Sequence, residues 1–258
     1  MTEYDIAQLA EKPEGEYEVQ PFSERVGSVV AYTVALTYIL RELMKETRTG
    51  VIGSYKLGFV DENIFTGLKT SGENLVQITK PKVTDIFEGE SISHTRRFIN
   101  AVKKALGIDV SVLVRNDDNA ELIRAYIDKN TSLITSMKND LIKRIEQEVY
   151  KAKIDNKSAT ELSKILQKQF GLMKNRADLI ASDQLSKLNA DMNELRLKQA
   201  GNKDYRWDYQ HGIPRQNSRE HHKARHGRIF KFGKPAEDMP SKALRCTCRA
   251  TMVVRVVK

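Results

Sequence analysis

Cysteine, proline and tryptophan are scarce in this chain of 258 residues, which contains two, six and one of them. The two cysteines, Cys246 and Cys248, lie one residue apart, so a disulfide between them would close a strained ring. Neither thiol can staple distant parts of the chain. A secreted, disulfide-rich domain is therefore disfavoured, and the thiols suit a reducing cytosol.

Long apolar runs are also missing. The most apolar stretch, residues 26–40, is about fifteen residues long and is interrupted by Ser28, Thr33 and Thr37. A transmembrane helix needs about 20 apolar residues, so this stretch favours a buried helix. The first 18 residues are acidic and polar and do not resemble a secretory signal. We expect no association with a membrane.

The positive charge is concentrated in one segment. The chain contains 43 Lys and Arg against 34 Asp and Glu, a net charge of +9. Residues 203–258 contain 14 of the basic residues and five of the acidic ones, so the whole excess lies there. A basic excess on one segment points to an anionic partner such as DNA, RNA or an acidic protein face, without indicating sequence specificity.

The first 116 residues form a region whose role the sequence does not indicate. Short β-prone pieces between residues 51 and 90 are separated by glycines and Pro81, which predicts a hairpin or small sheet. Ser93 is a plausible helix cap, and Gly107 a plausible helix stop. The expected elements are an extended arm (1–24), a helix (25–48), the small sheet (51–90) and a helix (93–106).

Residues 117–202 are strongly helical in pattern. Apolar residues recur at three- and four-residue spacing, which is typical of amphipathic helices packed on a core. Ser158 and Glu161 match a capping box that starts a new helix. We expect helices to begin near Asn119, at Thr131 and at Ser158, with stops at Gly171 and Gly201, and to form an antiparallel bundle.

The last region, residues 203–258, switches to a β-prone pattern. Strands are expected at 205–209, 227–232 and 251–257, with a short helix or turn at 221–226. The predicted fold class is α+β: a mainly helical frame with a small C-terminal β-containing module. The expected regions are 1–116, 117–202 and 203–258.

The C-terminal module also holds a set of candidate metal ligands. Four of the five histidines lie in it, at positions 211, 221, 222 and 226. His222 and His226 are four residues apart and would share one face of a helix, while Cys246 and Cys248 offer two neighbouring thiols. Two sulfur and two nitrogen ligands favour zinc in tetrahedral geometry.

Two plainer interpretations stay open. Histidines in a basic stretch can form a solvated face toward a polynucleotide, and the cysteines can be small buried side chains packed against Trp207 and Phe230. The surrounding cations would repel a metal ion unless the thiolates supplied charge. Contacts to nucleic-acid phosphates are expected from six residues: Arg219, Lys223, Arg225, Arg228, Arg245 and Arg249.

The second half of the chain contains an ordered series of motifs. The series comprises Arg176-Ala-Asp-Leu-Ile-Ala181, Asp183-Gln184, Asn189, Gly201, Tyr205-x-Trp207, Arg219-x-x-His222-x₄-Gly227-x-x-Phe230, Pro240 and Cys246-Thr-Cys248. In this order the motifs resemble the phage head-morphogenesis proteins, the Mu F-like minor head proteins, over about residues 117–254. The Asp that many members carry before Arg-x-x-His is replaced by a stretch with Arg215 and Asn217, and Thr247 stands where members usually have Arg.

The resemblance implies a minor structural protein of a tailed-phage head, made in the host cytoplasm and incorporated into the capsid interior in few copies. It implies the portal protein as a partner, with a scaffold or major capsid protein and double-stranded DNA as others, and a role in head assembly and in DNA packaging or ejection. We expect no enzymatic activity. The alternatives are another nucleic-acid-binding module or a metal-dependent nuclease, with His222 or His226 as base and Asp204, Asp208 and Glu220 as the acids.

Overall fold

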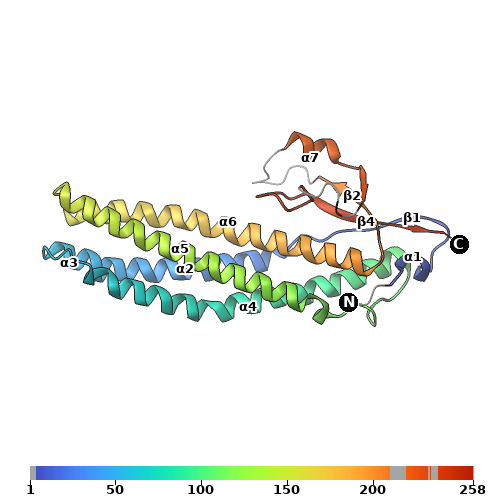
Figure 1. The fold of residues 1–258 in the computed structure, drawn as a ribbon, viewed down its shortest axis with the longest axis horizontal. Helices are drawn as coiled ribbons and strands as arrows, with labels where there is room; N and C mark the ends of the chain where they lie inside the picture. The colour runs from blue at the N-terminus through green and yellow to red at the C-terminus, as the bar shows by residue number, and fades with distance from the viewer. Residues whose placement is uncertain (1–3, 210–218, 232, 234–237, 258) are drawn as a thin grey trace. The chain divides into compact units, whose positions relative to one another are not determined.

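The computed structural model describes residues 4–209, 219–231, 233 and 238–257. Its elements are long helices and one four-stranded antiparallel sheet near the C-terminus, so the α+β fold class is confirmed (Figure 1). The chain divides into two compact units. Unit 1 comprises residues 1–26, 87–126 and 182–258, and unit 2 comprises residues 27–86 and 127–181. The expected boundaries at 116/117 and 202/203 therefore both fall inside unit 1.

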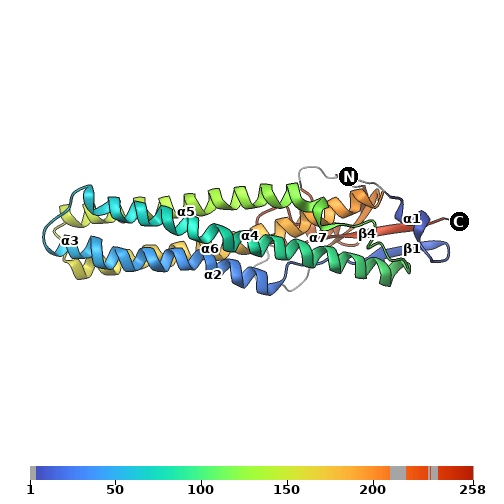
Figure 2. The same cartoon turned by 90° about the horizontal axis from the view of Figure 1, so that it is seen from below.

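The sheet lies in unit 1 and combines both ends of the chain. Its strands are β1 (Gly15–Val19), β2 (Asp204–Asp208), β3 (Ile229–Lys231) and β4 (Arg249–Val256), in the order β1-β4-β2-β3. The three C-terminal strands were expected. The edge strand β1 was not: residues 1–24 were predicted as an extended arm, yet β1 lies beside β4 (Figure 2). Gly15 pairs with Val256 and Val19 with Met252.

A single apolar cluster holds the N-terminal segment, the helices of unit 1 and one face of β4 together. The short helix α1 (Ile6–Leu9) begins at Asp5, whose carboxylate accepts the backbone N–H of Ala7. Gly201 follows the end of α6 (Ala159–Gln199) and has a φ of +64°. A Cβ at this position would lie 3.0 Å from the carbonyl oxygen of Tyr4, so glycine is needed here. Buried members of the cluster include Ile6, Val19, Phe98, Val102, Leu106, Leu197, Met252 and Val254.

Unit 2 is helical. The helix α2 (Val26–Glu46) continues through a wider π-helical turn (Thr47–Val51) into α3 (Ile52–Lys56). The helix expected over residues 25–48 therefore does not end there, and Gly50 lies inside this π-helical turn. By length and composition alone the stretch Val26–Lys56 could cross a membrane, with 39% of its most apolar window buried in the protein. Inside the unit, the Tyr32 hydroxyl donates to Asn130 at 2.7 Å, and both side chains are buried.

The small sheet expected at residues 51–90 was wrong. Residues 63–90 belong to α4 (Asn63–Leu106), which contains Pro81. The buried positions Leu68, Leu75, Val76, Val83 and Phe87 recur at helical spacing. This period outweighs glycine and proline as breakers, because burying a continuous apolar stripe stabilises the helix more than single poor helix formers destabilise it. The expected stop of this helix is confirmed, since Gly107 has a φ of +81°.

Two other helix boundaries also differ from expectation. The helix α5 (Ala120–Ile154) runs through Thr131, whose hydroxyl bonds back to the Ile127 carbonyl at 2.8 Å instead of capping a new helix. The helix α6 (Ala159–Gln199) runs through Gly171. The break between α5 and α6 is confirmed. Ser158 and Glu161 form the capping box, with the Ser158 N–H donating to the Glu161 carboxylate at 2.8 Å and the Glu161 N–H donating to the Ser158 hydroxyl at 3.3 Å.

Candidate metal centre and cationic module

A short helix and the tight turn after it place His222 beside the sheet. The helix α7 (Glu220–Arg225) lies between β2 and β3, as expected. Its C-terminal turn is fixed to β2 by two hydrogen bonds: Trp207 N–H donates to the Arg228 carbonyl and Gly227 N–H donates to the Trp207 carbonyl, both at 2.9 Å. Gly227 has a φ of +76°, which favours glycine at the return.

The segment before β4 brings the two cysteines to the same place. Ser241 and Arg245 have φ angles of 65° and 57°, so the backbone folds tightly there. The Ser241 hydroxyl donates to the Cys248 carbonyl, and the Cys246 N–H donates to the Ala243 carbonyl at 3.0 Å. These bonds hold Cys246 and Cys248 immediately ahead of β4, where both side chains are buried.

His222, Cys246 and Cys248 converge in the interior of the module. The His222 Nδ1 lies 3.4 Å from the Cys246 sulfur and 3.5 Å from the Cys248 sulfur. All three side chains are buried, with residue exposures of 1%, 3% and 0%, and both thiols are free. Three of the four predicted metal ligands therefore meet.

The other face of the His222 ring is fixed by a carboxylate. Nε2 lies 3.0 Å from Asp238, which also accepts from Arg225 at 2.6 Å and contacts His221 at 3.1 Å. Partial burial opposes ionisation of Asp238, but the hydrogen bonds from His222 and Arg225 hold the pKa of this carboxyl below its usual value. The edge of the His222 ring also meets the Trp207 ring, with centroids 5.0 Å apart.

The two thiols have pKa values that are shifted in opposite directions. The pKa of Cys246 is lowered to about 5, because the Cys248 thiol donates to its sulfur and the backbone N–H groups of Cys248 and Ser241 also donate to it, while burial opposes the shift. The pKa of Cys248 is raised, because its proton is held by Cys246 and because burial disfavours a second thiolate. The pocket therefore stabilises one thiolate without any metal.

The fourth predicted ligand, His226, does not reach this group. It follows α7 with an extended backbone, so its ring does not share a helix face with His222. Its Nδ1 accepts the backbone N–H of Tyr209 at 3.1 Å and lies 3.6 Å from Asp208, and the imidazole is about half exposed. His211, Arg215 and Asn217 lie outside the described residues.

Part of the chain, including this site, is similar to a phage protein family. Residues 143–252 match the Phage Mu protein F like family. The resemblance inferred from the motif series is thereby confirmed. The matched region is Mu F-like. It runs from α5 through α6, β2, α7 and β3 into β4, so it contains His222 and both cysteines.

The family suggests phage head morphogenesis and a component of the virion. An uncharacterized protein of Haemophilus influenzae is 28% identical over 166 residues, which are 63% of this chain. The chain spans only 36% of that relative's length. No solved structure matches the chain.

The six expected phosphate contacts of the Mu F-like region fall into two groups. Arg249 is 5% exposed and pairs with Glu24 at 2.9 Å, so it faces the interior. Arg225 pairs with Asp238 and lies over the Trp207 ring, and Arg219 donates to the Leu244 carbonyl at 3.0 Å. The exposed cations are Lys223, Arg228 and Arg245.

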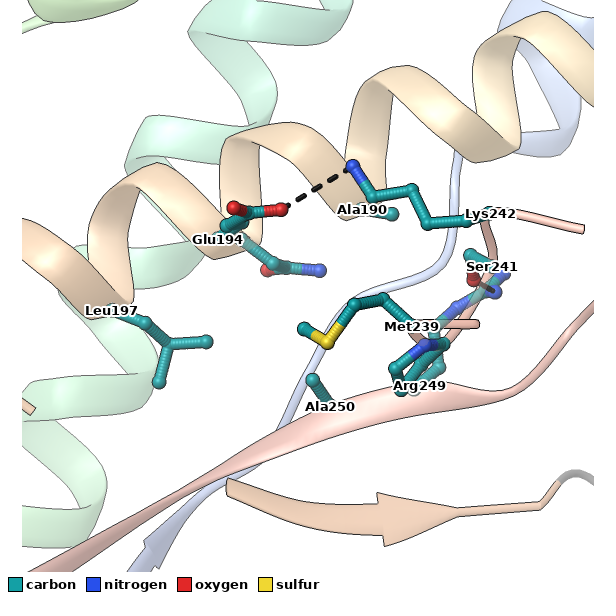
Figure 3. Close-up of a pocket in the computed structure, with 10 residues that line it drawn as sticks. Ala190, Glu194, Leu197, Met239, Ser241, Lys242, Arg249 and Ala250 are labelled. Carbon is teal, nitrogen blue, oxygen red and sulfur yellow. Dashed lines mark hydrogen bonds and ion pairs between the residues drawn. The ribbon is translucent and has the colours of Figure 1, made fainter. Parts of the chain in front are cut away.

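The C-terminal module (residues 203–258) is anchored on α6 by residues 239–242. Lys242 pairs with Asp191 and with Glu194, the latter at 3.3 Å, and the Met239 side chain lies close to Ala250 (Figure 3). The cavity between these groups has a volume of about 20 Å³, room for a single water molecule. This contact carries no ligand site and serves to fix the segment that leads to the cysteines.

The sequence did not reveal Asp238 as the partner of His222. The acids expected from the sequence were Asp204, Asp208 and Glu220, and of these three only Asp208 approaches a histidine, His226. Asp238 lies 16 residues after His222 with no spacing that marks it as a partner. Its approach to His222 could be seen only in three dimensions.

Proposed function

We propose that this chain is a minor structural protein of a tailed-phage head, which acts in head assembly at the portal and contacts double-stranded DNA through its exposed cations. The match of residues 143–252 to the Mu F-like family carries the first part of the proposal. The distribution of cations in the same region supports the second part. Head assembly places the protein in the host cytoplasm first and in the capsid interior afterwards.

The exposed cations suit phosphate contact rather than base recognition. Arg228 and Arg245 are exposed. Lys223 forms an ion pair with the exposed Glu220 at 2.7 Å, and breaking a surface ion pair of this kind costs little free energy. Phosphate contacts release counterions and carry no sequence information. We therefore expect binding that ignores sequence and weakens steeply as salt rises.

The binding test compares two exposed arginines with a matched control. Duplex DNA binding is measured from about 50 to 200 mM salt, the range over which counterion release dominates. Arg228→Ala and Arg245→Ala should each reduce the log–log slope by about 1. Arg255 is a suitable control, because it is also half exposed in unit 1 but pairs with Glu16 and Asp204. If all three variants bind as the parent does, these arginines do not contact DNA.

The assembly role is tested in particles. The protein should be found by mass spectrometry in purified virions, at few copies per portal ring, and should co-purify with the portal protein or with a scaffold or major capsid protein. Deleting the gene should produce heads with defective DNA content. Its absence from virions, together with plasmid nicking that is lost in His222→Ala, would favour the nuclease alternative.

A further inference from the structure

We propose that His222, Cys246 and Cys248 bind a zinc ion, which ties α7 to the segment that precedes β4. The proposal does not depend on the role in the phage head. It assigns a structural metal to the Mu F-like region and changes the ligand set expected from the sequence. His226 is no longer a ligand, and Asp238 orients the ligand His222.

The two distances from the His222 nitrogen to the cysteine sulfurs fit a tetrahedral ion. Zinc binds thiolate sulfur at about 2.3 Å and imidazole nitrogen at about 2.0–2.1 Å. In a tetrahedron, these bond lengths separate sulfur from nitrogen by roughly 3.6 Å. The His222 Nδ1 lies 3.4 Å from one sulfur and 3.5 Å from the other. The protein therefore holds the donors at coordination distance before the ion binds.

The orientation of the imidazole also fits a ligand. Asp238 accepts the Nε2 proton of His222 at 3.0 Å, which leaves the Nδ1 lone pair directed at the two sulfurs. Metal-binding histidines commonly donate their second N–H to a carboxylate in this way. Asp238 is itself held by Arg225 at 2.6 Å, so the ring is fixed by an ordered chain of contacts. Cysteines that only filled space beside Trp207 would not require this chain.

The charge balance favours the ion once the nearby cations are assigned. The sequence placed several arginines around the site, where they would repel a dication. In the structure Arg225 is paired with Asp238, and Arg249 is paired with Glu24, so neither contributes an uncompensated charge. Two thiolates and Zn²⁺ would be neutral together, which suits a buried site.

A zinc ion here would add a direct link between α7 and the segment before β4. Cys246 and Cys248 follow His222 by 24 and 26 residues, and the ion would close that loop. Tetrahedral zinc takes four ligands, of which the described residues supply three. A water molecule or a further donor completes the set. The module has a small core, so one ion would add substantially to its stability.

Metal analysis of the full chain, purified without chelator, tests the proposal. We expect about one zinc per chain. Replacing zinc by Co²⁺ should produce sulfur-to-cobalt charge-transfer absorption in the near ultraviolet, which reports thiolate ligands in the folded parent protein. Chelator should lower the melting temperature, and re-added Zn²⁺ should restore it.

Variants then identify the ligands. Cys246→Ser, Cys248→Ser and His222→Ala should lose the bound metal, whereas His226→Ala should retain it. Asp238→Asn should keep the site but weaken zinc binding by about 10–100-fold, the usual effect of removing an outer-shell partner. His226→Ala is the matched control, since it removes the second imidazole of the same turn.

Three results would overturn the proposal. The first is parent protein without metal whose melting is unchanged by chelator or by added Zn²⁺. The second is a Co²⁺ complex without charge-transfer absorption. The third is loss of metal in His226→Ala to the same extent as in His222→Ala. In the first two cases the thiols would be packing groups beside Trp207, and in the third the metal would be held by a different set of ligands. The proposed DNA contacts of Arg228 and Arg245 would be unaffected in all three cases.

Discussion

Arg249 of β4 donates to Glu24 at 2.9 Å, joining residues 225 positions apart in the sequence. Arg255 likewise pairs with Glu16 of β1, at 3.3 Å. The first 26 residues contain seven Asp and Glu against two Lys and Arg. The acidic N-terminal segment therefore neutralises part of the positive charge that the sequence concentrates in residues 203–258, and it belongs structurally to the C-terminal module.

Replacing Arg249 tests this connection. Arg249→Met should destabilise the protein by about 3 kcal/mol, because the change leaves the Glu24 carboxylate without its partner in a largely buried position. The double variant Arg249→Met, Glu24→Gln should recover part of the loss, since no charge is then stranded. Denaturant unfolding of the two variants measures both values. Equal stabilities of the single variant and the parent would show that the pair is solvated.

His94 should make the protein less stable in mild acid. Burial lowers the pKa of this imidazole to about 4, and nearby Arg196 and Arg97 act in the same direction, while the hydrogen bond with Asn193 opposes them. In the unfolded chain the pKa is 6.5. Between these values the unfolded state binds more protons, so stability present above pH 6.5 is lost as the pH falls toward 4.

The loss should approach on the order of 3 kcal/mol at pH 4, one pKa unit being 1.36 kcal/mol. His94→Gln should flatten the dependence of stability on pH in this window, and the exposed His221→Gln should not. Urea unfolding at intervals from pH 7 to pH 4 measures the slope. A parallel decline in parent and His94→Gln would assign the acid sensitivity to other groups.

Arg196 should resist even a conservative exchange. Its buried guanidinium donates to Asp118 at 2.9 Å, to the Arg115 carbonyl at 2.8 Å and to Thr95 at 3.0 Å. A lysine ammonium cannot match this planar set of acceptors. Arg196→Lys should therefore destabilise by about 2–4 kcal/mol, within the range for breaking buried charge networks. Lys198→Arg, an exchange of the same kind on an exposed side chain of α6, is the control and should change stability little.

Sequence reasoning succeeded where one local signal was strong. The Ser158 and Glu161 capping box, the stop at Gly107 and the three C-terminal strands each depend on a few neighbouring residues. The meeting of His222 with both cysteines could also be anticipated, because the ligand chemistry of His and Cys is specific.

It failed where distant packing decided the outcome. The sequence of β1 is too polar to predict a strand, and its partner strand β4 lies more than 200 residues later in the chain. The pairing of Arg249 with Glu24 was not predicted either, because the two residues are far apart in the sequence. The helix through Pro81 was missed because glycine and proline were given more weight than the buried stripe around Val83 and Phe87.

Two glycines of α4 allow a direct test of that helix. A Cβ at Gly67 would meet nothing within 4 Å. A Cβ at Gly72 would lie 2.6 Å from Cδ of Lys138 and 3.3 Å from Ile142. Lys138 is 4% exposed, so its methylenes have little room to move. The same substitution at two positions five residues apart should therefore have opposite effects.

Gly67→Ala should stabilise the protein by up to about 1 kcal/mol, because alanine is the better helix former in a helix interior. Gly72→Ala gains the same propensity but must displace Lys138, and overpacking of this kind costs about 1–3 kcal/mol, so we expect net destabilisation. Thermal and urea unfolding of the two variants measure the difference. If residues 63–90 formed the sheet that glycine and proline suggested, Gly67→Ala would bring no helical gain, and Gly72 would have no reason to differ from it.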